Sequence, residues 1–374
     1  MISRRVLASA ALVLGCSGVP AVDDAGRTRD SGSREDSGAI DGGGADSGGI
    51  DGGAVDSGGI DGGAVDGGER DDAGPPLDCT GLQESTWAGL ELDSTERGVE
   101  ASNIFVPGEW AYDLHYMPGS SVRSDAAHAR EPGTASIRSY ISPRVPIPPG
   151  VEYDANFRAE IARRPWHEVV PLGTELWIGF SYYLPSTYVQ DTANRATLFQ
   201  LHAGRHHPPI EIGHWVPIDY HGAHGTQLHV IRRWGGWNTL TFDRQTLPVT
   251  FEPGQWYDLV VHVVWDVDGG TRGLTELWVN GTRHYSAEGG NTFSAGTDDG
   301  DAMLPYGGTP KLGWYKWPWH DAPEVDASEA AGVTELEMYI GAVRLLRRAE
   351  GEHIGEQGYE CVAPRGARPA GPMP

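Results

Sequence analysis

The fold is decided by the stretch Trp256-Tyr257-Asp258-Leu259-Val260-Val261-His262-Val263-Val264-Trp265 and by the run Leu277-Trp278-Val279-Asn280-Gly281 that follows it. Both runs are rich in β-branched and aromatic residues, which favour strands. The connection begins with Asp266-Val267-Asp268-Gly269, which starts like a calcium-binding loop. Its twelfth position is Leu277, however, which cannot supply the bidentate carboxylate of such a loop. The pattern therefore predicts an antiparallel hairpin.

Similar short runs recur on both sides of this hairpin, between turns rich in Gly, Pro and Asp, and no long stretch has helical periodicity. We therefore expect residues 79–363 to form one all-β domain. The hairpin resembles the central hairpin of concanavalin-A-like β-jelly-roll sandwiches. This resemblance implies two curved antiparallel sheets around the core, with a concave face that is open as a substrate groove.

The N-terminus is predicted to export and anchor the protein. Residues 1–16 have the anatomy of a secretory signal peptide, with two arginines before a short apolar run. Val13-Leu14-Gly15-Cys16 resembles the lipobox of bacterial lipoproteins. The resemblance implies that Cys16 is acylated and that a lipid anchor holds the protein at the outer membrane or cell surface. An ordinary cleaved signal peptide is the alternative.

Residues 17–78 have the composition of a disordered tether. The ten-residue unit Asp-Ser-Gly-Gly-Ile-Asp-Gly-Gly-Ala-Val begins at Asp46 and again at Asp56. Gly and Asp at this density bury too little apolar surface to offset the entropy of the chain. A calcium-binding β-roll would need a nonapeptide pattern, which is absent. The Pro-, Gly- and Arg-rich residues 364–374 are predicted to be a disordered tail.

The charge and the cysteines restrict the partners and the stability of the domain. The chain has 52 acidic residues against 28 Lys and Arg, a net charge of −24. Such acidity argues against nucleic acid as a partner, and an anionic substrate must be met by locally concentrated cations. After removal of the signal peptide only Cys79 and Cys361 remain, at the two ends of the folded region. In an exported protein this pair predicts a disulfide, with two buried free thiols as the alternative.

Three short segments are polar on one side and apolar on the other when each is treated as a strand. The polar sides carry Arg158, Glu160, Gln200, His202, Lys311 and Tyr315. The only two lysines of the chain, against 26 arginines, both lie in Lys311-Leu312-Gly313-Trp314-Tyr315-Lys316, which marks this stretch for chemistry. Trp314 falls on the apolar side, and we expect it in the core. Gln, His, Lys and Tyr together suit proton transfer at a sugar that carries a carboxylate.

Six ordered motifs together resemble a jelly-roll polysaccharide lyase. They are Arg-Ala-Glu-Ile at 158–161, Trp-Ile-Gly-Phe-Ser-Tyr-Tyr-Leu-Pro at 177–185, Phe-Gln-Leu-His at 199–202, Gly-Gln-Trp-Tyr at 254–257, Trp-Val-Asn-Gly at 278–281 and Lys-Leu-Gly-Trp-Tyr at 311–315. The pattern is most similar to the heparin lyase I-like family, with alginate and glucuronan lyases as relatives. The resemblance implies a groove in which Gln200, His202, Lys311 and Tyr315 are catalytic.

The reaction implied is β-elimination in an acidic, uronate-containing polysaccharide. The enzyme must neutralise the sugar carboxylate while the C5 proton leaves, and Arg158, Gln200 and Lys311 are predicted for this role. His202 is the candidate base, or Tyr315 if nearby cations ionise its phenol. Tyr315 is also predicted to protonate the O4 leaving group.

Further substrate contacts are predicted for Arg158, Lys316, Arg232, Arg233 and Trp317. Glu160 is expected to form a buried pair with Arg158 and so to orient it. Two departures from alginate lyases put alginate in doubt as the substrate. Alginate lyases have aromatic residues where this chain has Thr309-Pro310, and they have an arginine where this chain has Ala162.

Metal and cofactor signals are weak. Seven of the 14 histidines fall between His202 and His229, among them His206, His221 and His224, but no set with zinc spacing emerges. We therefore expect no required cofactor, with a structural calcium, as in some relatives, left open. We also expect a monomer.

Two other functions compete with the lyase. A laminarinase-type glycoside hydrolase is suggested by Glu91-Leu92-Asp93-Ser94-Thr95-Glu96, which nearly matches a paired-carboxylate strand, although Ser94 stands where an apolar residue is wanted. A lectin-like carbohydrate-binding surface module with the same sandwich is the second alternative. Such a module does not need Gln200, His202, Lys311 and Tyr315 together, which favours the lyase.

Overall fold

The computed structural model describes residues 77–90, 105–106, 110–113, 119–145, 157–163, 170–203, 207–214, 227–236, 239–267, 272–294, 296–298, 301–303 and 307–365. All of them belong to the unit Arg70–Pro374. The predictions for the signal peptide, Cys16, the tether as far as residue 76, the segment Glu91–Glu96 and the tail from residue 366 lie outside the described residues.

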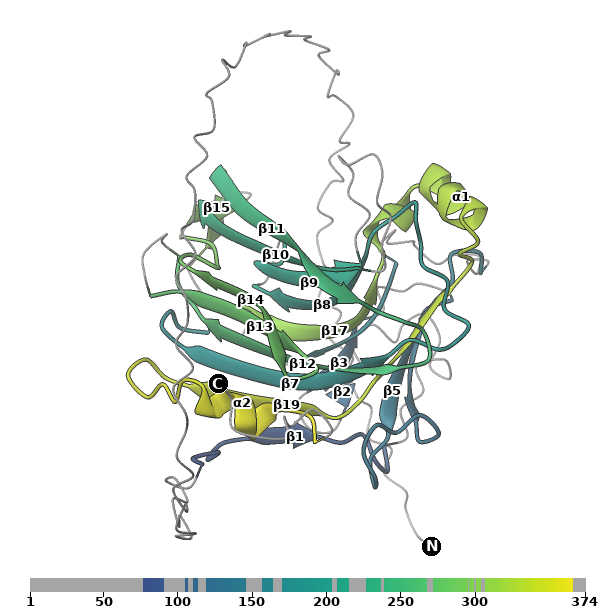
Figure 1. Ribbon diagram of the computed structural model, residues 1–374. Helices are drawn as coiled ribbons and strands as arrows, with labels where there is room; N and C mark the ends of the chain where they lie inside the picture. Colours follow the sequence, from purple (N-terminus) through teal and green to yellow (C-terminus); the bar gives the residue numbers. More distant parts are fainter. Residues whose placement is uncertain are drawn as a thin grey trace, which may run out of the picture. The chain divides into compact units, whose positions relative to one another are not determined.

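Eight antiparallel strands form the sheet that carries the candidate site. In spatial order they are β11 (Thr239–Thr250), β10 (Gln227–Gly236), β9 (Ile210–His214), β8 (Ala196–His202), β17 (Thr309–Tyr315), β6 (Arg158–Arg163), β3 (Trp110–Asp113) and β2 (Phe105–Val106). Figure 1 shows β11, β10, β9, β8 and β17 side by side in this order. The three polar segments predicted from the sequence are therefore the neighbouring strands β8, β17 and β6.

Nine strands form the second sheet. Its main path is β14 (Thr282–Glu288), β13 (Leu274–Val279), β12 (Trp256–Val264), β7 (Glu175–Tyr183), β18 (Leu336–Ile340), β5 (Ser136–Ile141) and β4 (Ser121–Asp125). β19 (Val343–Arg348) pairs with β7 and also with β1 (Gln83–Ser85). The predicted hairpin is confirmed, because β12 pairs with β13 from Leu259 opposite Val279 to Val264 opposite Leu274. A separate small hairpin joins β15 (Gly296–Asp298) to β16 (Asp301–Met303).

The hydrophobic core lies between the two sheets. Phe180 of β7 stacks on Phe199 of β8 with the ring centroids 5.2 Å apart. The hydroxyl of Ser139, on β5, donates a hydrogen bond to the carbonyl of Ala159 and accepts one from the backbone N–H of Trp314. Strands from opposite sheets are thus joined by both apolar and polar contacts. The fold is the predicted all-β jelly-roll sandwich, and the concave groove stays a prediction.

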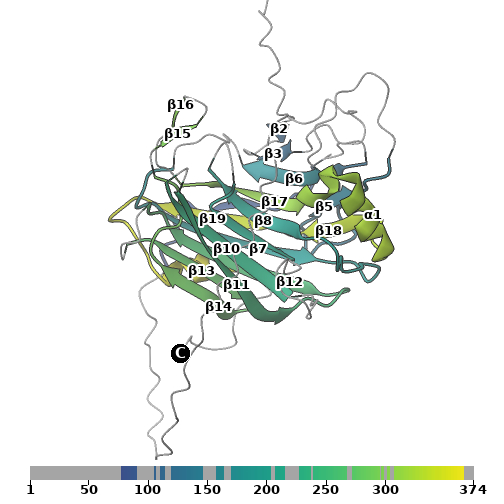
Figure 2. The same ribbon diagram turned by 90° about the horizontal axis from the view of Figure 1, so that it is seen from above.

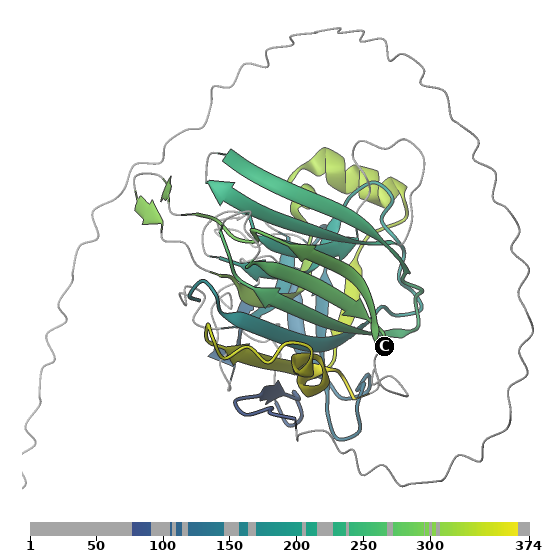
Figure 3. The same cartoon turned by 60° about the vertical axis from the view of Figure 1, so that its left-hand side comes forward.

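The C-terminal segment covers the outer face of the nine-stranded sheet. Helix α2 (Gln357–Val362) packs there in a second apolar cluster with Trp177, Trp278 and Leu346. The predicted disulfide is confirmed, since Cys79 and Cys361 are bonded with their Cα atoms 5.5 Å apart. Figure 3 shows this yellow segment beside the dark blue strand β1, so the disulfide joins the two ends of the described chain.

Two further helical elements follow β17. They are the 3₁₀ helix η3 (Trp317–His320) and the helix α1 (Ala322–Ala330). Figure 2 shows α1 to the right of β5 and β18. Within the described ranges, no helix is long and apolar enough to cross a bilayer.

Candidate functional site

The candidate site is the face of the eight-stranded sheet that points away from the core, which we call the polar face. Ala159, Ile161, Phe199, Leu312 and Trp314 pack in the core. Strand residues alternate between the two faces, so the side chains between these positions lie on the polar face. It carries Arg158, Glu160, Thr197, Gln200, His202, Glu211, His229, Arg233, Lys311 and Tyr315.

The strand register arranges these residues in rows across the sheet. Lys311 of β17 is paired with Gln200 of β8, and Gln200 is paired with Glu211 of β9. Tyr315 is paired with both Arg158 and Thr197. Residues distant in the sequence are therefore direct neighbours on the polar face, and this neighbourhood requires all four strands.

A hydrogen bond crosses β17 and joins a residue of β8 to a residue of β6. The side-chain amide of Gln200 donates to the carboxylate Oε1 of Glu160 over 2.6 Å, although β17 lies between their strands. The β17 residue opposite Glu160 is Gly313, which has a φ of +128° and presents no side chain. A Cβ atom at Gly313 would lie 2.2 Å from the carbonyl oxygen of Ala159. The glycine of the Lys-Leu-Gly-Trp-Tyr motif thus permits the close approach of β17 to β6.

Arg158 is held between a carboxylate and an aromatic ring. Its guanidinium lies 3.8 Å from Glu160 Oε2, which confirms the predicted buried pair. The same guanidinium carbon lies 4.4 Å from the centre of the Tyr315 ring. Cation–π contact and ion pairing together orient the arginine beside the phenol. Arg158 and Glu160 are both buried, at 8% and 0% exposure.

The phenol of Tyr315 is neutral in this environment. Burial raises the pKa of Tyr315 to about 12, the nearby Arg158 opposes this rise, and the carboxylates of Glu160 and Glu211 add to it. Arg158 lowers this pKa by less than burial raises it, and ionisation of Tyr315 by nearby cations stays a prediction. A neutral phenol suits protonation of a leaving group.

Sequence reasoning missed a second carboxylate on the polar face. Glu211 accepts a hydrogen bond from the hydroxyl of Thr197 and pairs with Arg233 over 2.9 Å. Burial raises the pKa of Glu211, but the charges of Arg233 and Arg195 outweigh it and lower the pKa overall. The signal that could have revealed this residue is the alternation Ile210-Glu211-Ile212, a carboxylate between two core residues.

His202 lies on the polar face but apart from Tyr315. It is paired with Thr309, whereas Tyr315 is paired with Thr197, so Lys311 and Gln200 lie between them. On β8, His202 is five positions beyond Thr197, the partner of Tyr315, which is roughly 15 Å along the strand. The structure therefore places Tyr315 beside Arg158 and Lys311 beside Gln200, and the Gln200–Glu160 hydrogen bond joins these two rows. His202 lies in the row beyond Gln200.

Lys316 does not belong to the polar face, and its prediction as a substrate contact is wrong. Its side chain is fully buried, with Nζ 2.7 Å from the Asp191 carboxylate and 2.6 Å from the carbonyl of Asn194. Burial lowers the pKa of Lys316 to about 8 against the opposing effect of Asp191. The strand ends at Tyr315 and η3 begins at Trp317, so this lysine turns into the protein instead of continuing the strand.

Arg232 and Arg233 are adjacent and therefore lie on opposite faces of β10. Arg233 lies on the polar face and binds Glu211. Arg232 donates to the backbone carbonyl of Glu288, on β14 of the other sheet, so its prediction as a substrate contact is wrong. Trp317 is 42% exposed, just beyond Tyr315, and its predicted role in substrate binding stays a prediction.

The described histidines do not form a metal centre. His229 lies on the polar face and its ring contacts the hydroxyl of Thr246, while His214 is buried on the core side near Trp314. Burial lowers the pKa of His214 to about 3, with smaller contributions from His229 and Lys316. In the described part of the chain no group of three or more His, Cys, Asp or Glu side chains could hold a metal ion. His206, His221 and His224 lie outside it.

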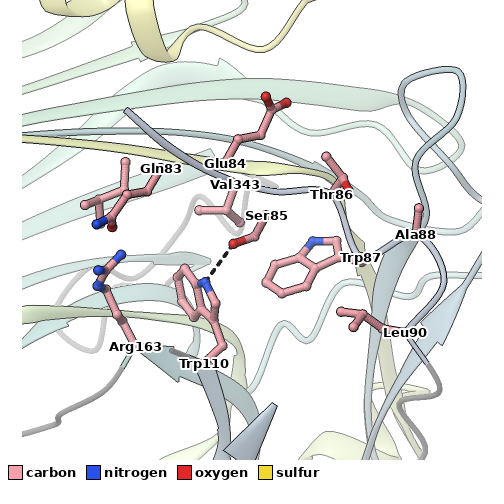
Figure 4. A pocket seen from close by; sticks show the side chains of 11 residues that line it. Gln83, Glu84, Ser85, Thr86, Trp87, Ala88, Leu90, Trp110, Arg163 and Val343 are labelled. Atoms are coloured by element: carbon pink, nitrogen blue, oxygen red, sulfur yellow. Dashed lines mark hydrogen bonds between the residues drawn. The ribbon is translucent and has the colours of Figure 1, made fainter. Parts of the chain in front are cut away.

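A pocket of about 400 Å³ lies away from the polar face. It is lined by residues of β1, β3, β6 and β19, and Figure 4 shows the indole of Trp110 donating to Ser85 there. Arg163 reaches this pocket from the core side of β6, opposite to Glu160. Trp87 and Trp110 are each only 2% exposed, so neither ring is open for stacking on a sugar.

Comparison with known families gives the class of the protein. Residues 100–340 match the family model described as polysaccharide lyase. This match covers more than half of the chain, and the protein belongs to the polysaccharide lyase family. It is a lyase that acts on polysaccharides.

Solved structures of similar fold are lyases and glucanases. An endo-β-1,4-glucuronan lyase from the fungus Trichoderma reesei is 16% identical, with 61% of this chain and 87% of that chain covered and a TM-score of 0.46. An alginate lyase from Alteromonas sp. 272 is 12% identical, covering 61% and 94%, with a TM-score of 0.38. An endo-1,3-β-glucanase from Streptomyces sioyaensis is 10% identical, covering 74% and 99%, with a TM-score of 0.38. No curated protein matches the sequence.

Proposed function

We propose that the protein cleaves a uronate-containing polysaccharide by β-elimination on the polar face, in the manner of the heparin lyase I-like family. The observation that carries the proposal is the cluster of Arg158, Gln200, Lys311 and Tyr315 on adjacent strands, with the Arg158 guanidinium 4.4 Å from the Tyr315 ring. A cation beside a neutral phenol meets the two demands of the reaction, which are charge neutralisation and proton donation.

The carboxylate of the sugar would be neutralised by two cations and an amide. Arg158 and Lys311 supply positive charge next to Tyr315 and Gln200 respectively. Gln200 gives one N–H to Glu160, and its amide has a second N–H for the substrate. As the C5 proton leaves, charge develops on the carboxylate, so donors that are already in place lower the barrier.

The phenol of Tyr315 would protonate O4 as the C4–O4 bond breaks. The C5 proton goes to a base, the C5–H electron pair becomes the C4–C5 double bond, and O4 leaves with the phenolic proton. His202 is one candidate base, and it would have to reach C5 from the row beyond Lys311 and Gln200 while Tyr315 reaches O4. A Tyr315 phenolate that removes the C5 proton and returns it to O4 is the other.

The test is the ultraviolet absorbance of the unsaturated uronate that only elimination creates. The whole exported protein would be incubated with glucuronan, heparin, heparan sulfate, chondroitin sulfate, hyaluronan, alginate and pectate. We expect absorbance to rise with one unsulfated polymer, and Tyr315→Phe to reduce the rate by roughly two to four orders of magnitude. The control is Tyr140→Phe, because Tyr140 lies on β5 of the other sheet and its hydroxyl donates to Glu335. A flat trace with every polymer, alongside binding to one of them, would favour the lectin-like module.

The pH dependence of the rate distinguishes the two bases. If Tyr315 is the base, the rate rises tenfold per pH unit on the alkaline side, because the phenolate fraction grows toward the pKa of about 12. If Tyr315 acts only as the acid, the rate does not rise in this way. In that case His202→Ala should abolish turnover.

We also propose that the enzyme is exported and held at the outer membrane or cell surface through acylated Cys16. The lipobox-like Val13-Leu14-Gly15-Cys16 supports this, and Cys79 bonded to Cys361 is the chemistry of an oxidising compartment. Labelling cells with a radioactive fatty acid should mark the wild-type protein and leave Cys16→Ser unlabelled. Equal labelling of both proteins would contradict the anchor.

A further inference from the structure

Phe242 is the most exposed of the large hydrophobic side chains in the described residues, at 58%. It lies on β11, the edge strand of the eight-stranded sheet, and is paired with Arg233 of the polar face. The next residue, Asp243, accepts a hydrogen bond from Tyr285 of β14, in the other sheet. Phe242 therefore points to the polar face, because neighbouring strand residues point to opposite faces.

Arg244 follows on the same face of β11. It is exposed and is paired with Ile231 of β10, and its guanidinium carbon lies 5.9 Å from the centre of the Phe242 ring. The pair thus offers a flat aromatic ring with a positive charge at its side. A sugar ring presents an apolar face for stacking, and a uronate adds a carboxylate that such a cation attracts.

The register aligns this pair with the candidate site. Arg244, Ile231, Glu211, Gln200 and Lys311 form one continuous row across β11, β10, β9, β8 and β17. From β8 to β11 there are three strand spacings, or about 14 Å. One sugar of an extended chain spans a length comparable to one strand spacing, so a polymer that crosses the strands would reach Phe242 about three sugars from Gln200.

We propose that Phe242 and Arg244 form a distal subsite that binds a uronate unit about three sugars from the reacting bond. This inference rests on the proposed function, in which the polysaccharide is cleaved on the polar face. The row from Arg244 to Lys311 has a cation at each end, and the one carboxylate within it, Glu211, is paired with Arg233, so the charge suits a polyuronate chain. The occupant is the same unsulfated polyuronate chain that is cleaved at Tyr315.

The test compares substrates that do and do not span the distance. Phe242→Ala and Arg244→Ala would be assayed on glucuronan, on its hexamer and on its trimer. We expect KM on the polymer and hexamer to rise roughly threefold to tenfold, with kcat unchanged. On the trimer, which is too short to reach β11, KM should not change. Phe242→Trp should retain the wild-type KM. Val145→Ala serves as the control, because Val145 is an exposed apolar residue in the turn that follows β5.

Two results would overturn the inference while leaving the proposed function intact. These are an unchanged KM on the polymer, or an equal rise on the trimer. A second readout separates binding from chemistry, namely retardation of the protein in gels that contain glucuronan. Even without any elimination product, weaker retardation of Phe242→Ala than of Val145→Ala would support the subsite, and equal retardation of the two would exclude it.

Discussion

Lys316→Ala tests whether the second lysine of the Lys-Leu-Gly-Trp-Tyr-Lys stretch is structural. Its ammonium lies 2.7 Å from Asp191, whose side chain is 3% exposed, and 2.6 Å from the carbonyl of Asn194. Removal of one partner leaves the Asp191 charge buried without its counter-ion. Breaking such a pair costs about 3–5 kcal/mol. We expect the free energy of unfolding to fall by this amount and KM of the folded protein to stay unchanged.

The assay is denaturant unfolding followed by tryptophan fluorescence, with kinetics on the folded fraction. Two variants serve as controls. Lys311→Ala, on the same strand but on the polar face, should lower kcat/KM and cost less stability. Arg144→Ala removes an exposed cation that pairs with Asp326 and Glu329 of α1, and it should change stability little. If Lys316→Ala kept full stability and raised KM, the buried role would be refuted and a substrate contact restored.

Three other predictions concern the framework of the site. Replacing Cys79 and Cys361 by Ser removes a disulfide that closes a loop with a sequence separation of 282, and it should lower the free energy of unfolding, measured thermally or with denaturant, by about 5 kcal/mol. Reduction of the disulfide without loss of stability would contradict this prediction. Burial lowers the pKa of His262, but the carboxylates of Glu175 and Glu276 outweigh burial and raise this pKa overall. The protonated His262 therefore stabilises the fold fully below pH about 6.5, and this stabilisation is lost as the pH rises through the raised pKa. Unfolding free energy measured from pH 6 upward should therefore fall for the wild type and be flatter for His262→Gln. Gly313→Ala should lower the free energy of unfolding by about 3 kcal/mol and reduce kcat, because the new Cβ atom would lie 2.2 Å from the carbonyl oxygen of Ala159. The control is Gly351→Ala, which should cost less stability because Gly351 also has a positive φ, +86°, but has open space around it. Equal losses of stability in the two variants would show that the close approach at Gly313 is unimportant.

Much of the fold was predictable because strand alternation is a local property. The run from Trp256 to Trp265 identified β12, and the alternation around Lys311 correctly placed Leu312 and Trp314 in the core. Cys79 and Cys361 were paired correctly because they are the only cysteines of the chain besides Cys16. The strands were predictable from a few neighbouring residues, and the disulfide was predictable from the number of cysteines.

The errors arose where the alternation ends or where neighbours were treated alike. Lys316 follows the last residue of β17, and the turn into η3 directs it inward to Asp191. Arg232 and Arg233 look equivalent in the sequence, but adjacent strand residues must face opposite sides, so only Arg233 lies on the polar face. Glu211 was missed because its partners belong to β8 and β10.

The sequence by itself determined the strand content, the disulfide and the residue types available for proton transfer, because these depend on local pattern and composition. Only the tertiary structure decided which of these residues meet. The pairing of β17 with both β8 and β6 places Tyr315 beside Arg158, joins Gln200 to Glu160 over Gly313, and leaves His202 one row away. The pairing of Tyr315 with Arg158 joins residues 157 positions apart (315 − 158). Such pairings are fixed by the register of whole strands, which no single segment encodes.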